Sequence, residues 1–455
     1  MIISFRNTGS PGICPKSDTR LFAILGFLSA IFFFATCLKA QPADKGPVNY
    51  SIQKKEGKWI LLREGVPFYI KGAASVDGKN SYVDKLSSYG GNSLRIWRNF
   101  AENLDKAQQN DVTVLITLPL KGERHGLDLD DSMQVIQEKE RILDTVRQYK
   151  DHPALMCWSL GNELEIVPGK SYNRKLWSVI DDLAVQIHKI DSAHPVMTII
   201  SGGGIQHESR EIFRHCPNLD LLGINSYHDI AEVCMLARQI WPKPYVITEW
   251  GPTSYHHGMP YTEWNAPIEQ TSSQKAECYQ YRYENVIQAD EAHCLGSYVF
   301  LWGQRQERTH TWFSMFDENG LESQTVEVMR VLWSGSEPPN HVPRIDSLYL
   351  DGRTSISDIY LHPGKVYPAR VVCHDPDRDE MEFRWDVRAE VKPTGYAGIG
   401  EIPAEPVTDL ILIKNQKHIK FRSPSEPGAY RLFVKILDNH GHYGGGNIPF
   451  YVTDY

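Results

Sequence analysis

The chain has 455 residues, of which 41% are hydrophobic and 11% aromatic, and its formal net charge is −8. This length exceeds the usual size of one compact domain, so we expect a large domain followed by a smaller module. The charge is spread along the chain without a basic block, which argues against a nucleic acid or an anionic membrane surface as the partner.

The N-terminus has the pattern of an export signal. An apolar run over residues 21–38 follows three basic residues, which are Arg6, Lys16 and Arg20. This pattern predicts a signal peptide over residues 1–40, with cleavage after Ala40. Acylation of Cys37 and retention of the run as a membrane anchor are the two alternatives. We therefore expect a periplasmic or extracellular protein, with this segment as the only means of membrane attachment.

The next segment, 41–66, contains a predicted lead-in hairpin, because apolar residues alternate around Glu56-Gly57 and Glu64-Gly65. Beyond it, short apolar runs alternate with helical patterns. One helix is expected within 171–191, where apolar residues recur at spacings of four and three. The expected strands are 67–74, 93–97, 113–119, 154–160, 195–201, 219–226, 244–249 and 295–302.

Eight strand–helix units, closed by a helix at 323–333, predict an α/β fold: a (β/α)8 TIM barrel over residues 67–335. A doubly wound open sheet is the structural alternative. That fold leads us to expect a glycine-rich phosphate turn after the first strand, and the sequence KGAASVDG there contains no GxGxxG. The barrel is therefore the better interpretation.

A linker rich in Pro, Ser and Gly is expected over 336–343, followed by a β-sandwich over 344–455. The last segment alternates short apolar runs with turn residues and shows no helical pattern, which favours an Ig-like sandwich. It resembles the polycystic-kidney-disease-type and cadherin-like modules that are often appended to secreted polysaccharide enzymes. Three of its acidic residues form a candidate calcium site, although a solvated turn is the more common explanation; they are Asp375, Asp377 and Asp379.

Two predicted strands end in a glutamate beside aromatic residues. The run CWSLGNELE places Glu163 after the fourth barrel strand, and PYVITEWG places Glu249 at the end of the seventh. The carboxyl ends of barrel strands form the catalytic face, so both side chains are expected over the same central pit. Two facing carboxyl groups are what glycoside hydrolysis requires, one protonated and one ionised.

These motifs resemble those of the retaining glycoside hydrolases of the Asn-Glu barrel clan, and most of all the catalytic barrel of glycoside hydrolase family 2. The resemblance covers roughly residues 50–335. It rests on five strand ends in order: SLRIW at 93–97, WSLGNE at 158–163, GINSY at 223–227, ITEWG at 247–251 and FLWGQ at 300–304. Family 2 enzymes carry sandwich domains before the barrel, whereas here only a leader and a hairpin precede it.

The resemblance implies that Glu163 is the general acid/base and Glu249 the nucleophile. It also implies substrate-binding or supporting roles for Arg95 as the partner of Glu249, Asn162 on the sugar 2-hydroxyl and Tyr227 as a donor to Glu249. Trp302 is expected at the floor of the subsite, with Trp97 and Trp250 as weaker candidates of the same kind. Loop residues His125, His228 and His257 are further candidates for contact with hydroxyl groups, whereas Glu123, Glu165 and Asp317 are interpreted as loop charges.

No metal and no cofactor are expected at this site, because the sequence shows no HxH cluster at a strand end and its cysteines lack CxxC spacing. The predicted function is retaining hydrolysis of an O-glycosidic bond, of β type, in an oligo- or polysaccharide outside the cytoplasm. The alternatives are a transglycosylase on the same scaffold and a non-catalytic carbohydrate-binding barrel. The sugar, the linkage, the choice between exo and endo action and the oligomeric state do not follow from the sequence.

Overall fold

The computed structural model describes residues 46–75, 82–393 and 401–454. The predicted signal peptide, 1–40, lies outside these residues. The chain from Lys45 to Tyr455 forms one compact unit. No helix within the described ranges is long and apolar enough to cross a lipid bilayer.

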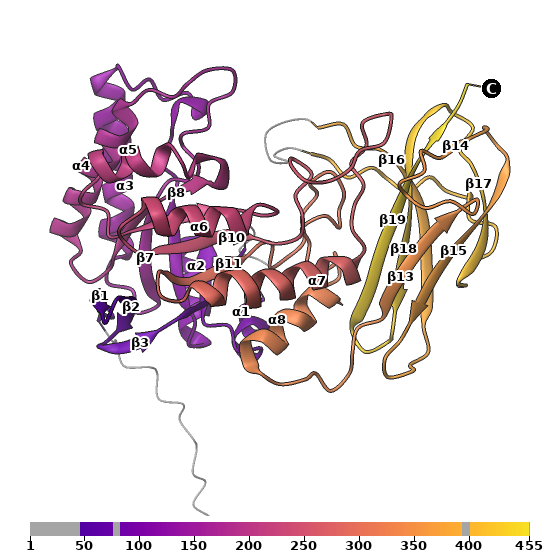
Figure 1. Cartoon of the computed structure of the whole chain (residues 1–455), viewed down its shortest axis with the longest axis horizontal. Helices are drawn as coiled ribbons and strands as arrows, with labels where there is room; N and C mark the ends of the chain where they lie inside the picture. Colours follow the sequence, from indigo (N-terminus) through magenta and orange to yellow (C-terminus); the bar gives the residue numbers. More distant parts are fainter. Residues whose placement is uncertain (1–45, 76–81, 394–400, 455) are drawn as a thin grey trace, which may run out of the picture. The chain divides into compact units, whose positions relative to one another are not determined.

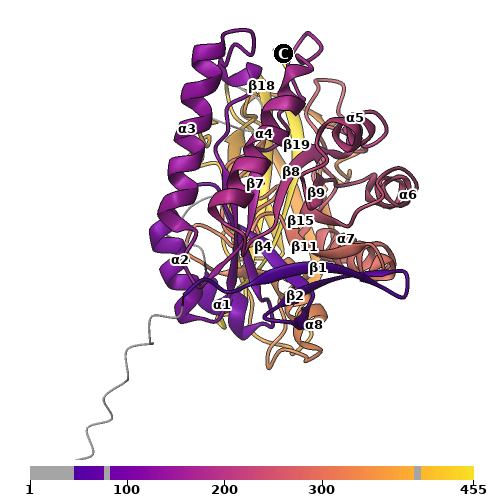
Figure 2. The ribbon, with the colours of Figure 1, turned by 90° about the vertical axis from the view of Figure 1, so that its left-hand side faces the viewer.

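A small antiparallel sheet precedes the barrel and covers its amino-terminal end (Figure 2). The predicted hairpin is present, and a third strand extends it. The Tyr50 N–H donates to Ala193 O at 2.8 Å, and the Trp59 N–H donates to Ala292 O at 2.9 Å. Both acceptors directly precede barrel strands. The sheet consists of β1 (Tyr50–Lys55), β2 (Lys58–Arg63) and β3 (Val66–Phe68).

Within the described residues, eight parallel strands close into a barrel in the order β10, β11, β4, β5, β6, β7, β8, β9. Each overlaps one of the eight predicted strands, so the predicted TIM barrel is confirmed. The strands are β4 (Ile70–Ala74), β5 (Ser93–Ile96), β6 (Thr113–Leu118), β7 (Leu155–Leu160), β8 (Val196–Ser201), β9 (Leu221–Asn225), β10 (Tyr245–Trp250) and β11 (Cys294–Val299).

The barrel strands are apolar because both of their faces are covered. Every residue of β6, TVLITL, and of β7, LMCWSL, is buried. Closure between β11 and β4 depends on Gly296, whose φ is +128°. A Cβ atom at this position would lie 2.2 Å from Ile70 O. Only glycine fits where these two backbones come so close.

Helices surround the strands as an outer layer (Figures 1 and 2). Several begin at side chains that accept helix N–H groups, namely Asp131 before α3, Thr271 before α7 and Ser323 before α8. The α-helices are α1 (Val83–Ser88), α2 (Phe100–Gln109), α3 (Ser132–Tyr149), α4 (Lys175–Ile190), α5 (Glu208–His215), α6 (Ile230–Ile240), α7 (Ser272–Arg282) and α8 (Gln324–Ser334). Short 3-10 helices are Glu123–His125, Gly202–Gly204 and Gln288–Asp290, and Tyr283–Ile287 is a π-helix.

The C-terminal segment folds into two mainly antiparallel sheets around a core of its own, as a sandwich requires. The confirmed part of the prediction is the barrel followed by a sandwich; the Ig-like subtype stays a prediction. One sheet contains β13 (Arg344–Leu350), β15 (Val366–His374) and β17 (His418–Arg422). The other contains β16 (Glu382–Ala389), β18 (Gly428–Leu437), β19 (His442–Val452) and the short strands β12 (Glu322–Ser323) and β14 (Tyr360–Leu361).

Buried polar contacts join the barrel to the C-terminal sheets. Lys435 forms an ion pair with Asp317 at 2.8 Å. Arg431 Nη2 donates to Pro267 O at 2.6 Å. Asp317 is only 4% exposed, which corrects its interpretation as a loop charge. The strand β12, which leads into barrel helix α8, pairs with β19 of the sandwich. Hydrogen bonds thus run across the boundary between the two parts.

Candidate active site

The barrel brings the two predicted carboxylates to the same end of its strands. Glu163 lies three residues beyond β7, and Glu249 lies at the end of β10. Between these strands in the barrel order are β8 and β9, and Asn225 is the last residue of β9. The side chains of Glu163, Asn225 and Glu249 therefore face one site.

Arg95, at the end of β5, is the centre of a hydrogen-bond network at this site and is fully buried. Its Nη1 donates to Glu249 Oε1 at 3.0 Å and to Thr248 O at 2.8 Å. Its Nη2 donates to Asn162 Oδ1 at 2.7 Å. The contact between this buried guanidinium and the Glu249 carboxyl group is a charge-assisted hydrogen bond. This is the arrangement expected for Arg95, and it also fixes the amide of Asn162.

Asn225 was missed in the sequence, although it is part of the GINSY motif. Its Nδ2 donates to Glu163 Oε1 and to Asn162 Oδ1, both at 3.0 Å. Its Oδ1 accepts from Thr248 Oγ1 at 2.8 Å. Asn225 thus connects the Glu163 carboxyl to the network around Arg95, a role that the identity of the strand-end residue alone does not reveal.

The backbone at Glu163 adopts an uncommon conformation. Its φ is +48°, in the left-handed region, and its N–H donates to Ile199 O at 2.8 Å. Gly161, two residues earlier, also has a positive φ of +75°. A non-glycine residue in this region costs on the order of 1 kcal/mol and persists where the surrounding structure holds it. The turn after β7 therefore holds the Glu163 side chain over the barrel.

Burial and the neighbouring Glu249 carboxylate raise the pKa of Glu163 to about 7. Hydrogen bonding from Asn225 and the charges of Arg124 and Arg95 act in the opposite direction. Glu163 is thus the member of the pair that carries a proton near neutral pH, as a general acid must.

Tyr227 lies two residues beyond β9 and donates its hydroxyl to Glu249 Oε2 at 3.2 Å. Burial and the charge of Glu249 raise the pKa of Tyr227 well above its ordinary value, so its hydroxyl keeps its proton as a donor. Its ring packs against Phe313, with a centroid distance of 5.3 Å. Both oxygens of Glu249 therefore accept hydrogen bonds, one from Arg95 and one from Tyr227.

Glu165 is not the loop charge that the sequence suggested. It is 8% exposed, and its Oε1 accepts the Ser201 N–H at 2.8 Å. Its Oε2 is buried without a hydrogen-bond partner. Burial and the charge of Glu163 raise the pKa of Glu165 to about 8. A second protonated carboxyl therefore lies beneath the loop that carries Glu163.

Of the three tryptophans expected to contact substrate, only Trp97 keeps exposed surface. Its ring lies 4.2 Å from the Arg95 guanidinium carbon. Trp302 is fully buried against Phe316 and Trp333, and Trp250 is fully buried against aromatic residues of α7 and the π-helix. A ring without exposed surface cannot stack on a sugar, so this geometry does not support the stacking roles expected of Trp302 and Trp250.

The histidines are at the rim. His125 and His228 are exposed, and His228 lies 6.0 Å from His257 between ring centroids. Among the described residues, none of these three rings forms a hydrogen bond with Glu163 or Glu249. Glu123 accepts from Lys170 at 2.7 Å, as a loop ion pair does.

A cavity of about 610 Å³ has His228 at one edge of its lining. It is lined by side chains of α6, α7 and the loop that precedes α7, together with Ser355 and Ile356 of the C-terminal segment. Neither Glu163 nor Glu249 contributes to its lining. The candidate active site is therefore identified by the charged groups that converge around Arg95, and not by the size of this cavity.

Residues 120–322 match the family model "Glycosyl hydrolases family 2, TIM barrel domain". The match includes both carboxylates, Asn162, Asn225 and Tyr227, and it confirms the resemblance to the family 2 barrel. None of the curated proteins compared matches this chain.

Among solved structures, β-glucuronidase 2 of Bacteroides uniformis covalently bound to cyclophellitol-6-carboxylate aziridine is 13% identical, with a TM-score of 0.51. The β-glucuronidase of Parabacteroides merdae with glycerol in its active site is 10% identical, with a TM-score of 0.48. Each similarity covers 89% of this chain, and it covers 48% and 52% of those two proteins respectively. The chain thus spans about half the length of these neighbours, and at this identity the Bacteroides uniformis structure shows a shared fold and no more.

Proposed function

We propose that this protein is an O-glycosyl hydrolase that cleaves β-glycosidic bonds with retention of anomeric configuration. One observation carries the proposal: two carboxyls share a site in which their environments differ. Glu249 accepts hydrogen bonds from Arg95 and Tyr227, whereas burial raises the pKa of Glu163 to about 7. Such a division into an ionised and a protonated carboxyl is what the reaction needs.

In the first step, Glu249 attacks the anomeric carbon while Glu163 gives its proton to the leaving oxygen. The bond to the leaving group breaks as the ester to Glu249 forms, and the site then holds a glycosyl-enzyme. Esterification removes the charge of Glu249, which lowers the pKa of Glu163. In the second step, Glu163 takes a proton from water, and the resulting hydroxide releases the sugar from Glu249.

Arg95 and Asn162 support these steps by positioning the groups that take part in them. The Asn162 carbonyl oxygen accepts from both Arg95 and Asn225, which leaves its Nδ2 as the donor for a sugar hydroxyl. By the family resemblance this is the 2-hydroxyl, where a hydrogen bond strengthens in the transition state. Arg95 in turn lies under Trp97, whose remaining exposed surface is available to the substrate.

The substrate is proposed to be a carbohydrate outside the cytoplasm. The support for export is the basic and apolar pattern of residues 1–40. The neighbouring structures are named as β-glucuronidases. An aryl β-glucuronide is therefore the first substrate to test, in a panel with the corresponding glucoside, galactoside and mannoside.

The mechanism is tested by Glu249→Gly. We expect turnover to fall at least about a thousandfold, because the nucleophile is lost, and azide to restore activity with a sugar azide of inverted configuration as the product. Glu163→Ala should retain activity best on aryl glycosides with good leaving groups, since these need little protonation in the first step, although the second step still lacks its base. The exposed Glu232→Ala is the control and should behave as wild type. Full activity in Glu249→Gly would overturn the assignment, and transfer products in place of hydrolysis would indicate a transglycosylase.

A further inference from the structure

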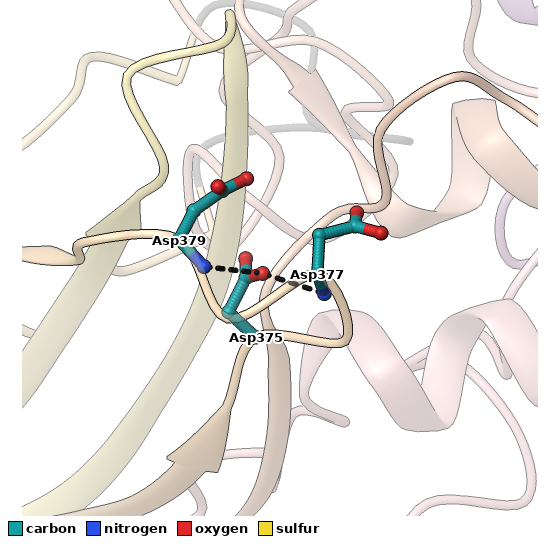
Figure 3. A group of neighbouring side chains, drawn as sticks. All are labelled: Asp375, Asp377 and Asp379. Carbon is teal, nitrogen blue, oxygen red and sulfur yellow. Dashed lines mark hydrogen bonds between the residues drawn. The ribbon is translucent and has the colours of Figure 1, made fainter.

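The turn between β15 and β16 of the C-terminal segment gathers three carboxyl groups. Asp375, Asp377 and Asp379 each contribute an oxygen, and these oxygens lie within 4.8 Å of one another. Figure 3 shows Asp375 between the other two side chains, with the carboxyl group of Asp377 turned away from it. The turn is distant in sequence from the candidate active site and plays no part in the proposed hydrolysis.

Asp375 is the buried member of this group, with 7% of its surface exposed. Its Oδ1 accepts the N–H groups of Asp377 and Asp379, at 2.9 and 3.1 Å. Its Oδ2 is buried and has no hydrogen-bond partner. In Figure 3 the second carboxyl oxygen of Asp375 points between the other two side chains. A buried carboxylate oxygen without a partner is costly, so this atom calls for a ligand.

The protein itself provides little positive charge here. In the part of the chain that the structure describes, no lysine or arginine forms an ion pair with these three carboxylates. The basic side chain that pairs with this group is His440, whose Nε2 lies 3.6 Å from Asp379 Oδ2 and is charged only when protonated. Asn340 donates to Asp377 and Asp379, and the His341 N–H donates to Asp377 at 2.5 Å. Neutral donors thus face a cluster of negative charge.

We propose that this turn binds one calcium ion through Asp375 Oδ2 and the carboxylates of Asp377 and Asp379. Calcium binds oxygen ligands at about 2.3–2.6 Å, so two ligands of one ion lie at most about 5 Å apart. The spacing of the three oxygens meets this condition. Magnesium requires a stricter octahedral geometry at about 2.1 Å and gives up its water reluctantly, so a turn of three aspartates suits calcium better.

Calcium at this position stabilises the connection between the two parts of the molecule. Asn340 and His341 belong to the segment between α8 and β13, and both donate to the proposed ligands. Binding of an ion holds the turn in the conformation that these donors contact. The ion therefore links the end of the barrel to the first strand of the sandwich.

Calorimetric titration of the full chain, after treatment with EDTA and dialysis, tests the proposal. We expect one calcium ion per chain, with a dissociation constant between about 10⁻⁵ and 10⁻³ M. The midpoint of thermal unfolding should rise with calcium concentration, because calcium binds the folded state. Asp375→Asn should weaken binding at least tenfold and remove most of this rise. Asp377→Asn, at an exposed position that folding tolerates, should also weaken binding.

The matched control is Glu380→Gln, which removes one charge from the same turn at an exposed residue outside the cluster. It should bind calcium within about twofold of the wild-type affinity, as expected for a screened surface charge. The proposal is overturned if wild-type protein shows no saturable binding, or if Asp377→Asn and Glu380→Gln bind equally well. Equal affinity for magnesium would overturn the assignment to calcium.

Discussion

Asn225 is the residue through which the environment of Glu163 can be tested at the smallest scale. It hydrogen-bonds Glu163 Oε1, and this contact favours the charged carboxylate. In the wild type, we expect kcat/KM to fall above about pH 7, because Glu163 must be protonated to act as an acid. In Asn225→Ala the pKa of Glu163 rises further, so this descending limb should move to higher pH.

The measurement is the pH profile of kcat/KM on an aryl glycoside, with the exposed Asn285→Ala as the control. Activity at the optimum should fall at least about tenfold, since the hydrogen bond to Glu163, worth about 1.5 kcal/mol, is lost together with those to Asn162 and Thr248. A limb that stays in place or moves to lower pH contradicts the proposed contact between Asn225 and the acid.

Glu165 permits a prediction about stability rather than rate. Its pKa is raised by burial and by Glu163 to about 8, so folding favours its protonated form. The stability linked to this proton is complete below about pH 4.3, the ordinary pKa of glutamate, and is lost as the pH rises through about 8. Over that window the loss approaches about 1.4 kcal/mol per pH unit as an upper limit.

Glu165→Gln cannot ionise, so its free energy of unfolding should fall less than that of the wild type between pH 5 and pH 8. Urea unfolding at both pH values measures the difference, and Glu232→Gln is the control. Parallel pH dependence of wild type and Glu165→Gln would show that the carboxyl of Glu165 is solvated.

Individual site residues also differ in whether the sequence predicts their positions. Glu163 and Glu249 were predictable because each follows an apolar run whose end must lie at the rim of a barrel. Trp302 lies at a similar strand end, but its burial depends on Phe316 and Trp333, which are brought to it by later segments. Glu165 is two residues from Glu163 and would read as a loop charge, yet the turn after β7 places it against Ser201. Tertiary packing sets the direction in which a side chain points and how far it is buried. The spacing of motifs in the sequence gives no information on that packing.

At the scale of single elements, Gly296 decides whether β11 can close against β4. Its backbone has a φ of +128°, and an added Cβ would meet Ile70 O at 2.2 Å. The obstacle is backbone, so it cannot move as a side chain would. We expect Gly296→Ala to destabilise the fold by at least about 3 kcal/mol, or to prevent soluble expression.

Urea unfolding and soluble yield measure this effect. The control is Gly203→Ala, where the nearest atom to the added Cβ is Ser201 Oγ at 4.0 Å. Similar stability of the two variants would mean that the contact between β11 and β4 is looser than described. The strands themselves were predictable from their apolar runs, but the need for glycine at this point follows only from the closed barrel.

On the scale of the whole molecule, the barrel and the sandwich depend on each other. Glu269 of the barrel accepts from Asn447 at 2.6 Å, Pro267 O accepts from Arg431, and Asp317 pairs with Lys435. Removing the C-terminal segment leaves these buried barrel groups without their partners. A single broken buried ion pair costs about 3–5 kcal/mol.

We therefore expect the full chain to unfold in one calorimetric transition, and a chain cut after Gly335 to be insoluble or much less stable. Differential scanning calorimetry of both proteins provides the test. Two separate transitions, or a barrel of unchanged stability after truncation, would contradict the coupling. A boundary near residue 335 is a prediction from the Pro, Ser and Gly content there, whereas the contacts between the barrel and the sandwich do not follow from the sequence, since they join residues more than a hundred positions apart.

The sheet formed by β1, β2 and β3 has a practical consequence for handling the protein. It covers the amino-terminal end of the barrel through the contacts of Tyr50 and Trp59, opposite the end that carries Glu163 and Glu249. The described chain therefore begins at the end of the barrel away from the carboxylates. Immobilised on a support through a tag placed before Gly46, the protein should present its reactive side outward, so that even an insoluble polysaccharide can approach it.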